Sequence, residues 1–154
     1  MKMKLELVPV PVTDVDRAKS FYVDQMGFQA DLDVRPNEAV RIVQLTPPES
    51  ACSIVIGTGL PDIAMPPGSL RGLHLVVGDV RAAREALISR GVGVSEVEEH
   101  AQGVKYAFFS DPMATPGPCK KCPGDQKSFK WCVVYEQGSK HSGASRKQVC
   151  NPRT

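Results

Sequence analysis

Two stretches of the chain share the same order of apolar and polar positions. Residues 12–18 (VTDVDRA) match residues 77–83 (VGDVRAA) at an offset of 65 residues. An apolar stretch of strand length precedes each match, and apolar residues at helical spacing follow it. Asp14 and Asp79 stand where a helix-capping carboxylate would accept the free amide hydrogens of the first turn. The pattern predicts an internal duplication of one strand–helix unit.

The same duplication extends beyond the predicted helices. Gly27 and Gly91 follow them, where a left-handed C-terminal residue is least costly. The turns at Pro47 and Pro112 again match at the same offset. Between helix and turn the sequence predicts short strands, at 28–34, 39–45 and 52–56 in the first unit and at 92–97 and 104–109 in the second. The predicted unit is therefore βαβββ, present twice, and the second copy lacks its fourth strand.

These stretches resemble the vicinal-oxygen-chelate superfamily, which includes glyoxalase I, bleomycin-resistance proteins and extradiol dioxygenases. The resemblance rests on VPVTDVDRAKSFY at 10–22 with Met-Gly-Phe at 26–28, and on LVVGDV at 75–80 with YAFFSDP at 106–112. It covers residues 4–112 and implies an α+β fold. Paired βαβββ modules would form a curved half-barrel sheet around a small-molecule cavity. It implies little about activity, because the superfamily hosts many chemistries.

The organisation that follows has four parts. We expect a first module at 4–57, a Pro/Gly-rich linker at 58–70, a second module at 71–112 and an atypical tail at 113–154. Of 154 residues, 42% are hydrophobic and 23% are charged, which is typical of a globular domain. The sequence has neither an apolar run of membrane-spanning length nor a signal-peptide pattern, so we expect a cytoplasmic protein without a membrane partner.

Charge and cysteine change abruptly after Pro112. Residues 1–112 carry 11 Lys and Arg against 15 Asp and Glu, whereas residues 113–154 carry 8 against 2. Four of the five cysteines also lie in the tail. The two parts therefore differ in composition, and the difference needs an explanation.

A frameshift offers one explanation. In the superfamily, Asp-Pro is usually followed by Asp-Gly-Asn, an aromatic residue and a strand that ends in glutamate, whereas this chain has MATPGPCKKC at 113–122. One permitted coding of that stretch, read one base earlier, spells Asp-Gly-Asn-Thr-Trp-Ala-Leu-Gln-Glu-Val. We hypothesise that residues 113–154 are a frameshifted read; a natural lineage-specific tail is the alternative, and the gene's nucleotide sequence decides between them.

The resemblance also indicates where a divalent metal would bind. The superfamily takes His, Glu or Gln ligands from the first and fourth strands of each unit. The first-strand positions, seven residues before the capping aspartates, are Leu7 and Gly72, and the fourth-strand position of the first unit aligns with Ile56. None of these side chains has a donor atom. We therefore expect no metal and no other cofactor at these positions; a displaced metal site in a glyoxalase-like lyase or dioxygenase is the alternative.

Candidate ligand-binding residues remain on the predicted strands. His74 shares the cavity-facing side of its strand with Gly72, and it could orient a ligand, act as a general base or simply pack in the sheet. Arg41 and Gln44 point to opposite faces of one strand, so only one of them can line the cavity. Two tyrosines complete the set, Tyr106 on a central strand and Tyr22 on the first helix.

The tail has signals of its own. A Cys-x-x-Cys pair resembles half of a zinc site. Basic residues interleaved with aromatic ones are also typical of a nucleic-acid-binding tail, although a chance translation product explains both patterns equally well. Residues 129–135 have strand character and could fill the vacant fourth-strand position, whereas 138–154 should be disordered. The tail's candidate zinc ligands are Cys119, Cys122, Cys132, His141 and Cys150, and its aromatic residues are Phe129, Trp131 and Tyr135.

Together these observations favour a metal-free member of the superfamily that binds a small organic molecule. The resemblance further implies a homodimer, and the sequence disfavours nucleic acid as the main partner. The catalytic alternative and the tail-based zinc or nucleic-acid role stay open at this point.

Overall fold

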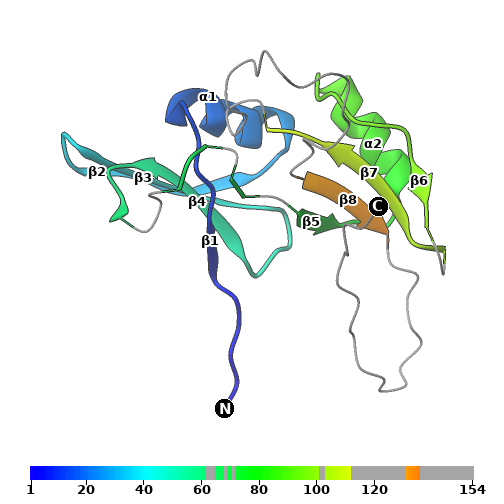
Figure 1. Ribbon diagram of the computed structural model, residues 1–154, viewed down its shortest axis with the longest axis horizontal. Coiled ribbons are helices and arrows are strands. Elements are labelled where there is room, and N and C mark those ends of the chain that lie inside the picture. The colour runs from blue at the N-terminus through cyan, green and yellow to red at the C-terminus, as the bar shows by residue number, and fades with distance from the viewer. Residues whose placement is uncertain (62–64, 68, 71, 101–102, 112–130, 136–154) are drawn as a thin grey trace.

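The chain forms two four-stranded sheets, each with its own helix (Figure 1). The computed structural model describes residues 1–61, 65–67, 69–70, 72–100 and 103–111, together with the backbone of 131–135. The first sheet has the order β1-β4-β3-β2 and the second has the order β5-β8-β7-β6. The sheets are curved and do not close into a barrel, which confirms the α+β fold of paired modules.

The two modules contain strands and helices in the same order. The first module contains β1 (Leu7–Pro9), α1 (Val15–Ser20) continued by the π-helical turn η1 (Phe21–Gln25), β2 (Gln29–Asn37), β3 (Val40–Thr46) and β4 (Ser53–Thr58). The second contains β5 (Leu73–Val76), α2 (Val80–Ser89), β6 (Glu98–Glu99), β7 (Lys105–Phe109) and β8 (Trp131–Tyr135). In each module the first and fourth strands pair in parallel. No helix among the described residues is long and apolar enough to cross a membrane.

The predicted helix boundaries are confirmed. The Asp14 carboxylate accepts the backbone N–H of Arg17 at 3.0 Å, and the Asp79 carboxylate accepts that of Arg81 at 2.8 Å. Each cap satisfies an amide that has no partner within its helix. Gly27 and Gly91 adopt φ angles of 77° and 83°, a left-handed conformation that favours glycine after a helix.

One hydrophobic core joins the two modules. Alternating residues of β3, Val43 and Leu45, are fully buried on the side that faces α1. In the second module Ala107 and Phe109 of β7 are fully buried in the same way. These residues belong to a single cluster with Tyr22 and its neighbours on the first helix. The helices therefore cover one face of each sheet, and the opposite face of each sheet is left open.

The fourth strand of the second module comes from the tail. The backbone of Trp131–Tyr135 pairs in parallel with β5 and antiparallel with β7, so the strand character of this segment is confirmed. It lies further along the chain than the duplication predicts. Val8 and Leu73 are equivalent at the offset of 65 residues, but Val8 pairs with Ile54, whereas Leu73 pairs with Trp131. The other tail predictions, the zinc ligands, the nucleic-acid signal and disorder at 138–154, lie outside the described residues.

One predicted strand is shorter than expected. The apolar alternation at 92–97 predicts a strand, but the structure has only a bridge from Val94 to Phe109 before the short β6. The serine that follows continues the interaction, since the Ser95 N–H donates to the Phe108 carbonyl at 2.8 Å. Glycines on either side of Val92 weaken strand formation at the start of this segment.

Candidate functional site

The open face of the second sheet carries a cluster of aromatic rings. Tyr106 and Phe108 alternate with the core residues of β7, so their side chains lie on the face opposite α2. Their rings are nearly parallel, with centroids 6.0 Å apart and an interplanar angle of 11°. Together they form an apolar aromatic surface against which a ligand ring can pack.

Two histidines flank this surface. The His74 ring meets the Tyr106 ring edge to face at 6.0 Å, and the His100 ring does so at 5.1 Å. His100 Nε2 also lies 3.5 Å from a Glu98 carboxylate oxygen. His74 and His100 are both exposed. The cluster therefore combines apolar ring faces with imidazole groups that can donate or accept hydrogen bonds.

The open face of the first sheet carries a chain of polar side chains. Gln44 Nε2 donates to Ser53 Oγ at 3.1 Å, and Ser53 Oγ lies 2.6 Å from Thr46 Oγ1. The Thr46 hydroxyl in turn donates to the Asp31 carboxylate. Exposed apolar side chains surround this chain at Leu7, Leu32 and Val34. This face is thus amphipathic, with its hydrogen-bonding groups linked to one another.

Comparison with known proteins identifies the family to which the chain belongs. The sequence model of the "Glyoxalase/Bleomycin resistance protein/Dioxygenase superfamily" matches residues 4–113. The chain belongs to this superfamily. No curated protein matches the chain.

Solved structures of the superfamily resemble this chain throughout their length. TnmS3, an antibiotic binding protein from Streptomyces sp. CB03234, is 33% identical with a TM-score of 0.66, over 90% of this chain and 98% of that chain. A glyoxalase/bleomycin resistance protein from the same organism is also 33% identical, with a TM-score of 0.62 over 87% of this chain and 100% of that chain. A superfamily member from Sphaerobacter thermophilus DSM 20745, 24% identical with a TM-score of 0.67 over 88% of this chain and 98% of that chain, shares the fold.

Two positions that the resemblance assigns to metal ligands, Leu7 and Gly72, lack donor atoms. Leu7 lies on the open face of β1, directly beside Ser53 in the parallel register. Gly72 precedes β5 with a φ of 77° and has no side chain. Among the described residues, no group of three or more His, Cys, Asp and Glu side chains could hold a metal ion. The donor set at these positions does not fit the divalent metal of the superfamily.

Ile56 occupies a different place from the one its alignment predicts. Its side chain is fully buried in the core, and Ile56 is the register partner of Val43, whose side chain lies on the helix side of the sheet. The neighbouring positions Ser53 and Val55 lie on the open face instead, since Val55 pairs with Gln44. The alignment through the turn prolines is therefore shifted by one residue, and it assigns the ligand position to the wrong face of β4. Neither Ser53 nor Val55 offers a good metal ligand.

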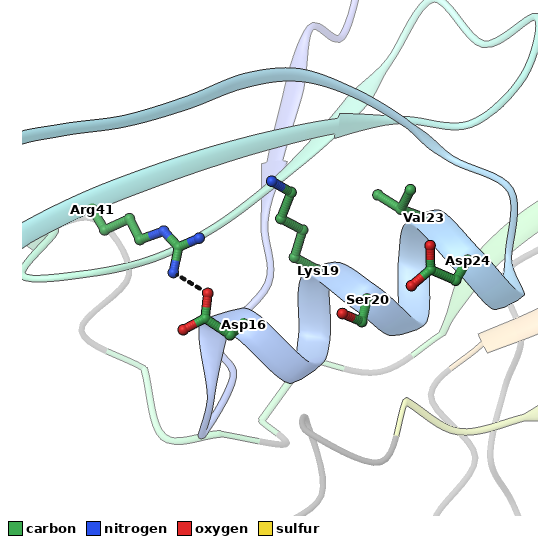
Figure 2. A pocket seen from close by; sticks show the side chains of 6 residues that line it. All are labelled: Asp16, Lys19, Ser20, Val23, Asp24 and Arg41. Atoms are coloured by element: carbon green, nitrogen blue, oxygen red, sulfur yellow. Dashed lines mark hydrogen bonds and ion pairs between the residues drawn. The ribbon is translucent and has the colours of Figure 1, made fainter.

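Arg41 lies on the helix side of the sheet and is only 8% exposed. Its guanidinium donates to both Asp33 carboxylate oxygens at 3.0 Å and to Asp16 on α1 at 2.6 Å. Figure 2 shows Arg41 extending from β3 toward Asp16, beside a cavity of about 290 Å³ that Lys19 also lines. Of the two predicted cavity residues on β3, Gln44 thus lies on the open face, and Arg41 connects the sheet to the helix.

The charges of this network stabilise one another. Hydrogen bonds from Arg41 and then Lys19, whose Nζ lies 2.8 Å from Asp33, hold the pKa of Asp33 well below its usual range. The same carboxylate and that of Asp16 raise the pKa of the Arg41 guanidinium. Both shifts favour the charged forms, so Asp33 and Arg41 are ionised at neutral pH.

Tyr22 is fully buried in the core rather than on the open face of either sheet. Its hydroxyl donates to the Asp111 carboxylate at 2.6 Å. The sequence did not single out Phe108, Ser53 or Thr46 as site residues. Strand alternation from Tyr106 and Gln44 could have placed Phe108 and Thr46 on the open faces, whereas Ser53 lies on β4 and its place depends on strand pairing.

Proposed function

We propose that this chain is a metal-free, small-molecule-binding member of the superfamily that acts by sequestering its ligand. The observation that carries the proposal is a contrast between two sets of residues. The metal positions hold Leu7 and Gly72, which cannot coordinate a metal, whereas the open face of the second sheet presents the rings of Tyr106 and Phe108. Such a site recognises shape and aromatic surface without a Lewis acid.

The proposed ligand is an aromatic, antibiotic-like organic molecule. Its ring system would stack on Tyr106 and Phe108, while His74 supplies a hydrogen bond at the edge of the stack. The antibiotic binding protein TnmS3, at 33% identity, supports this class of ligand. Gln44 and Ser53 on the first sheet are proposed as further polar contacts.

Elemental analysis of the purified full-length protein tests the metal-free part of this proposal. We expect no stoichiometric metal, whether or not divalent ions are added before gel filtration. Stoichiometric metal that survives Cys119→Ser with Cys122→Ser in the full chain would contradict the proposal and indicate a lyase or dioxygenase with a displaced site. Metal that is lost in this double variant would assign a zinc site to the tail.

Calorimetric titration with a panel of aromatic antibiotics, bleomycin included, tests the binding face. Tyr106→Leu keeps apolar volume but removes the ring, and it should weaken the best ligand by roughly tenfold, within the range of one aromatic contact. Lys105→Gln is the matched control, because Lys105 lies on the same strand and points to the opposite face. Equal effects of the two substitutions would contradict binding on the open face.

We also propose that the protein forms a homodimer. Met1, Met3 and Leu5 are 106%, 80% and 68% exposed, and they alternate with charged residues in an extended segment that projects beyond β1 (Figure 1). An apolar row of this kind is costly in water and is the surface that a second copy would cover. Light scattering should give the mass of two chains, and Met3→Lys with Leu5→Lys should shift the protein to the mass of one; a monomeric parent protein would contradict this.

A further inference from the structure

A cavity of about 690 Å³ lies between the two modules, on the side of the second sheet that carries α2. Its walls come from α2, from the turn after β3 and from the edge strand β5. Apolar side chains dominate its lining, among them Met26, Phe28, Leu75 and Leu87. Tyr106 and Phe108 do not line it, so it is separate from the aromatic surface, with His74 at the border of both.

The duplication explains why this space exists. In the first module Phe21 and Tyr22 are both buried at the end of the helix, and Tyr22 bonds to Asp111 just after β7. The corresponding positions on α2 are Ala86 and Leu87, which line the cavity under the turn after β3. Smaller side chains at the second junction therefore leave a space that the two aromatic residues fill at the first.

One cation reaches into this space. A Cβ atom on Gly27 would lie 2.9 Å from the nearer guanidinium nitrogen of Arg90, so the absence of a side chain at Gly27 makes room for Arg90. Gly27 sits between Met26 and Phe28 in the chain, and both of these line the cavity. Arg90 takes part in none of the ion pairs found among the described residues. Its charge is thus available to a ligand on an apolar surface.

The remaining charged residue of the lining is Glu49. It lies in the exposed turn Pro47–Ser50, which the Ser50 N–H closes by donating to the Pro47 carbonyl at 3.1 Å. Glu49 forms no ion pair with Arg90. An anionic ligand held by Arg90 would be repelled by Glu49. We therefore expect Arg90 to raise the affinity for an anion and Glu49 to lower it.

We propose that this cavity is a second binding site, for an organic anion with an apolar or aromatic body. The apolar part packs against Phe28, Leu75 and Leu87, and the anionic group pairs with the Arg90 guanidinium. The volume suits a drug-sized molecule. Arg90 is a positioning group for the anion, and the apolar lining supplies most of the contact area.

Two fluorescent probes of similar shape test the proposal on the full chain. The anionic probe is 8-anilinonaphthalene-1-sulfonate and the neutral one is N-phenyl-1-naphthylamine. Ala86→Phe gives α2 the same residue that the first module has at the equivalent position, Phe21. Because Ala86 is exposed, the substitution does not disturb the core. It should weaken both probes at least tenfold. Arg90→Gln should weaken only the anionic probe, by about tenfold, and Glu49→Gln should strengthen it.

Tyr106→Leu separates this site from the aromatic surface and should leave both probes unchanged. Circular dichroism and thermal melting of each variant confirm that it is folded. No binding of the anionic probe, or loss of binding in Tyr106→Leu but not in Ala86→Phe, would overturn the second site. Equal weakening of both probes by Arg90→Gln would overturn the preference for an anion.

Discussion

The hydroxyl of Tyr22 lies 2.6 Å from a carboxylate oxygen of Asp111, and neither residue is accessible to solvent. Tyr22 belongs to the first module's helix and Asp111 follows β7 of the second module. A buried carboxylate is costly unless it is hydrogen-bonded, so this contact ties the packing of one module to that of the other. In the second module the equivalent place, beside Leu87 of α2, is occupied by the cavity described above.

Tyr22→Phe should destabilise the protein by about 1–3 kcal/mol, because it removes a donor from a buried carboxylate while keeping the ring. Urea unfolding measures the change. Asp111→Asn in the Tyr22→Phe background should cost less than in the parent, since the interaction is already lost. Strictly additive effects of the two substitutions would contradict a direct energetic link between the residues.

Stability should fall in acid through Asp33. Its pKa is held low in the folded protein by Arg41 and Lys19, whereas an unfolded aspartate titrates near about 3.9. The carboxylate therefore stabilises the fold fully above about pH 4, and this contribution is lost as the pH falls toward the lower folded pKa. Unfolding free energy measured from pH 6 to pH 2 should fall less steeply in Asp33→Asn than in the parent. Asp24→Asn is the control; the same slope in all three proteins would contradict the assignment.

Arg41 is the nearly buried member of the same network. Arg41→Met should destabilise the protein by about 2–3 kcal/mol, because Asp33 and Asp16 lose their shared partner. Thermal and urea unfolding both report the change. Arg17→Met on the exposed side of α1 is the control and should stay within about 0.5 kcal/mol of the parent. A change as small for Arg41 as for Arg17 would show that the ion pairs do not stabilise the fold.

Glu49 has a φ of 61° and is the only non-glycine residue with a positive φ among the described residues. Glycine is preferred at this third turn position, so Glu49→Gly should stabilise the protein by about 1 kcal/mol and raise its melting temperature. Glu38→Gly, at an exposed position without a positive φ, should not stabilise it. A lower melting temperature for Glu49→Gly would show that the carboxylate makes a stabilising contact of its own.

Two truncations test the role of β8. The chain 1–135 keeps all strands that the structure describes, whereas the chain 1–130 loses the strand that lies between β5 and β7. Loss of a central strand leaves two unpaired edges, so 1–130 should aggregate or unfold while 1–135 stays folded. Gel filtration and hydrogen exchange of β7 amides distinguish the two. Equal behaviour of both chains would show that the pairing of 131–135 does not hold the second sheet together.

The sequence predicted the order of elements in the first module, and in the second module up to its missing fourth strand, because the relevant signals are local. Capping aspartates, glycines after helices and the two periodicities each act over a few residues. Alternation placed His74 on the predicted cavity-facing side of its own strand, but only the structure shows that its ring meets the ring of Tyr106 on another strand. For Arg41 and Gln44 alternation showed that the two residues must take opposite faces, but it could not tell which of them faces the helix.

Pairing over long distances was harder to predict. A shift of one residue moves every side chain of a strand to the other face, which is why Ile56 was assigned to the wrong side. The segment 92–97 has strand alternation, yet only Val94 forms a bridge, because pairing also requires a partner strand in register.

The sequence by itself determined that this protein repeats a βαβββ unit of one superfamily without donor atoms at Leu7 and Gly72, but it left the fourth strand of the second copy open. Tertiary structure alone decided that Trp131–Tyr135 completes the second sheet, that Tyr22 bonds to Asp111, and that a cavity remains beside Arg90. The physical reason is that the sequence signals act between near neighbours along the chain. Strand register, buried hydrogen bonds and unfilled space depend on which distant side chains meet.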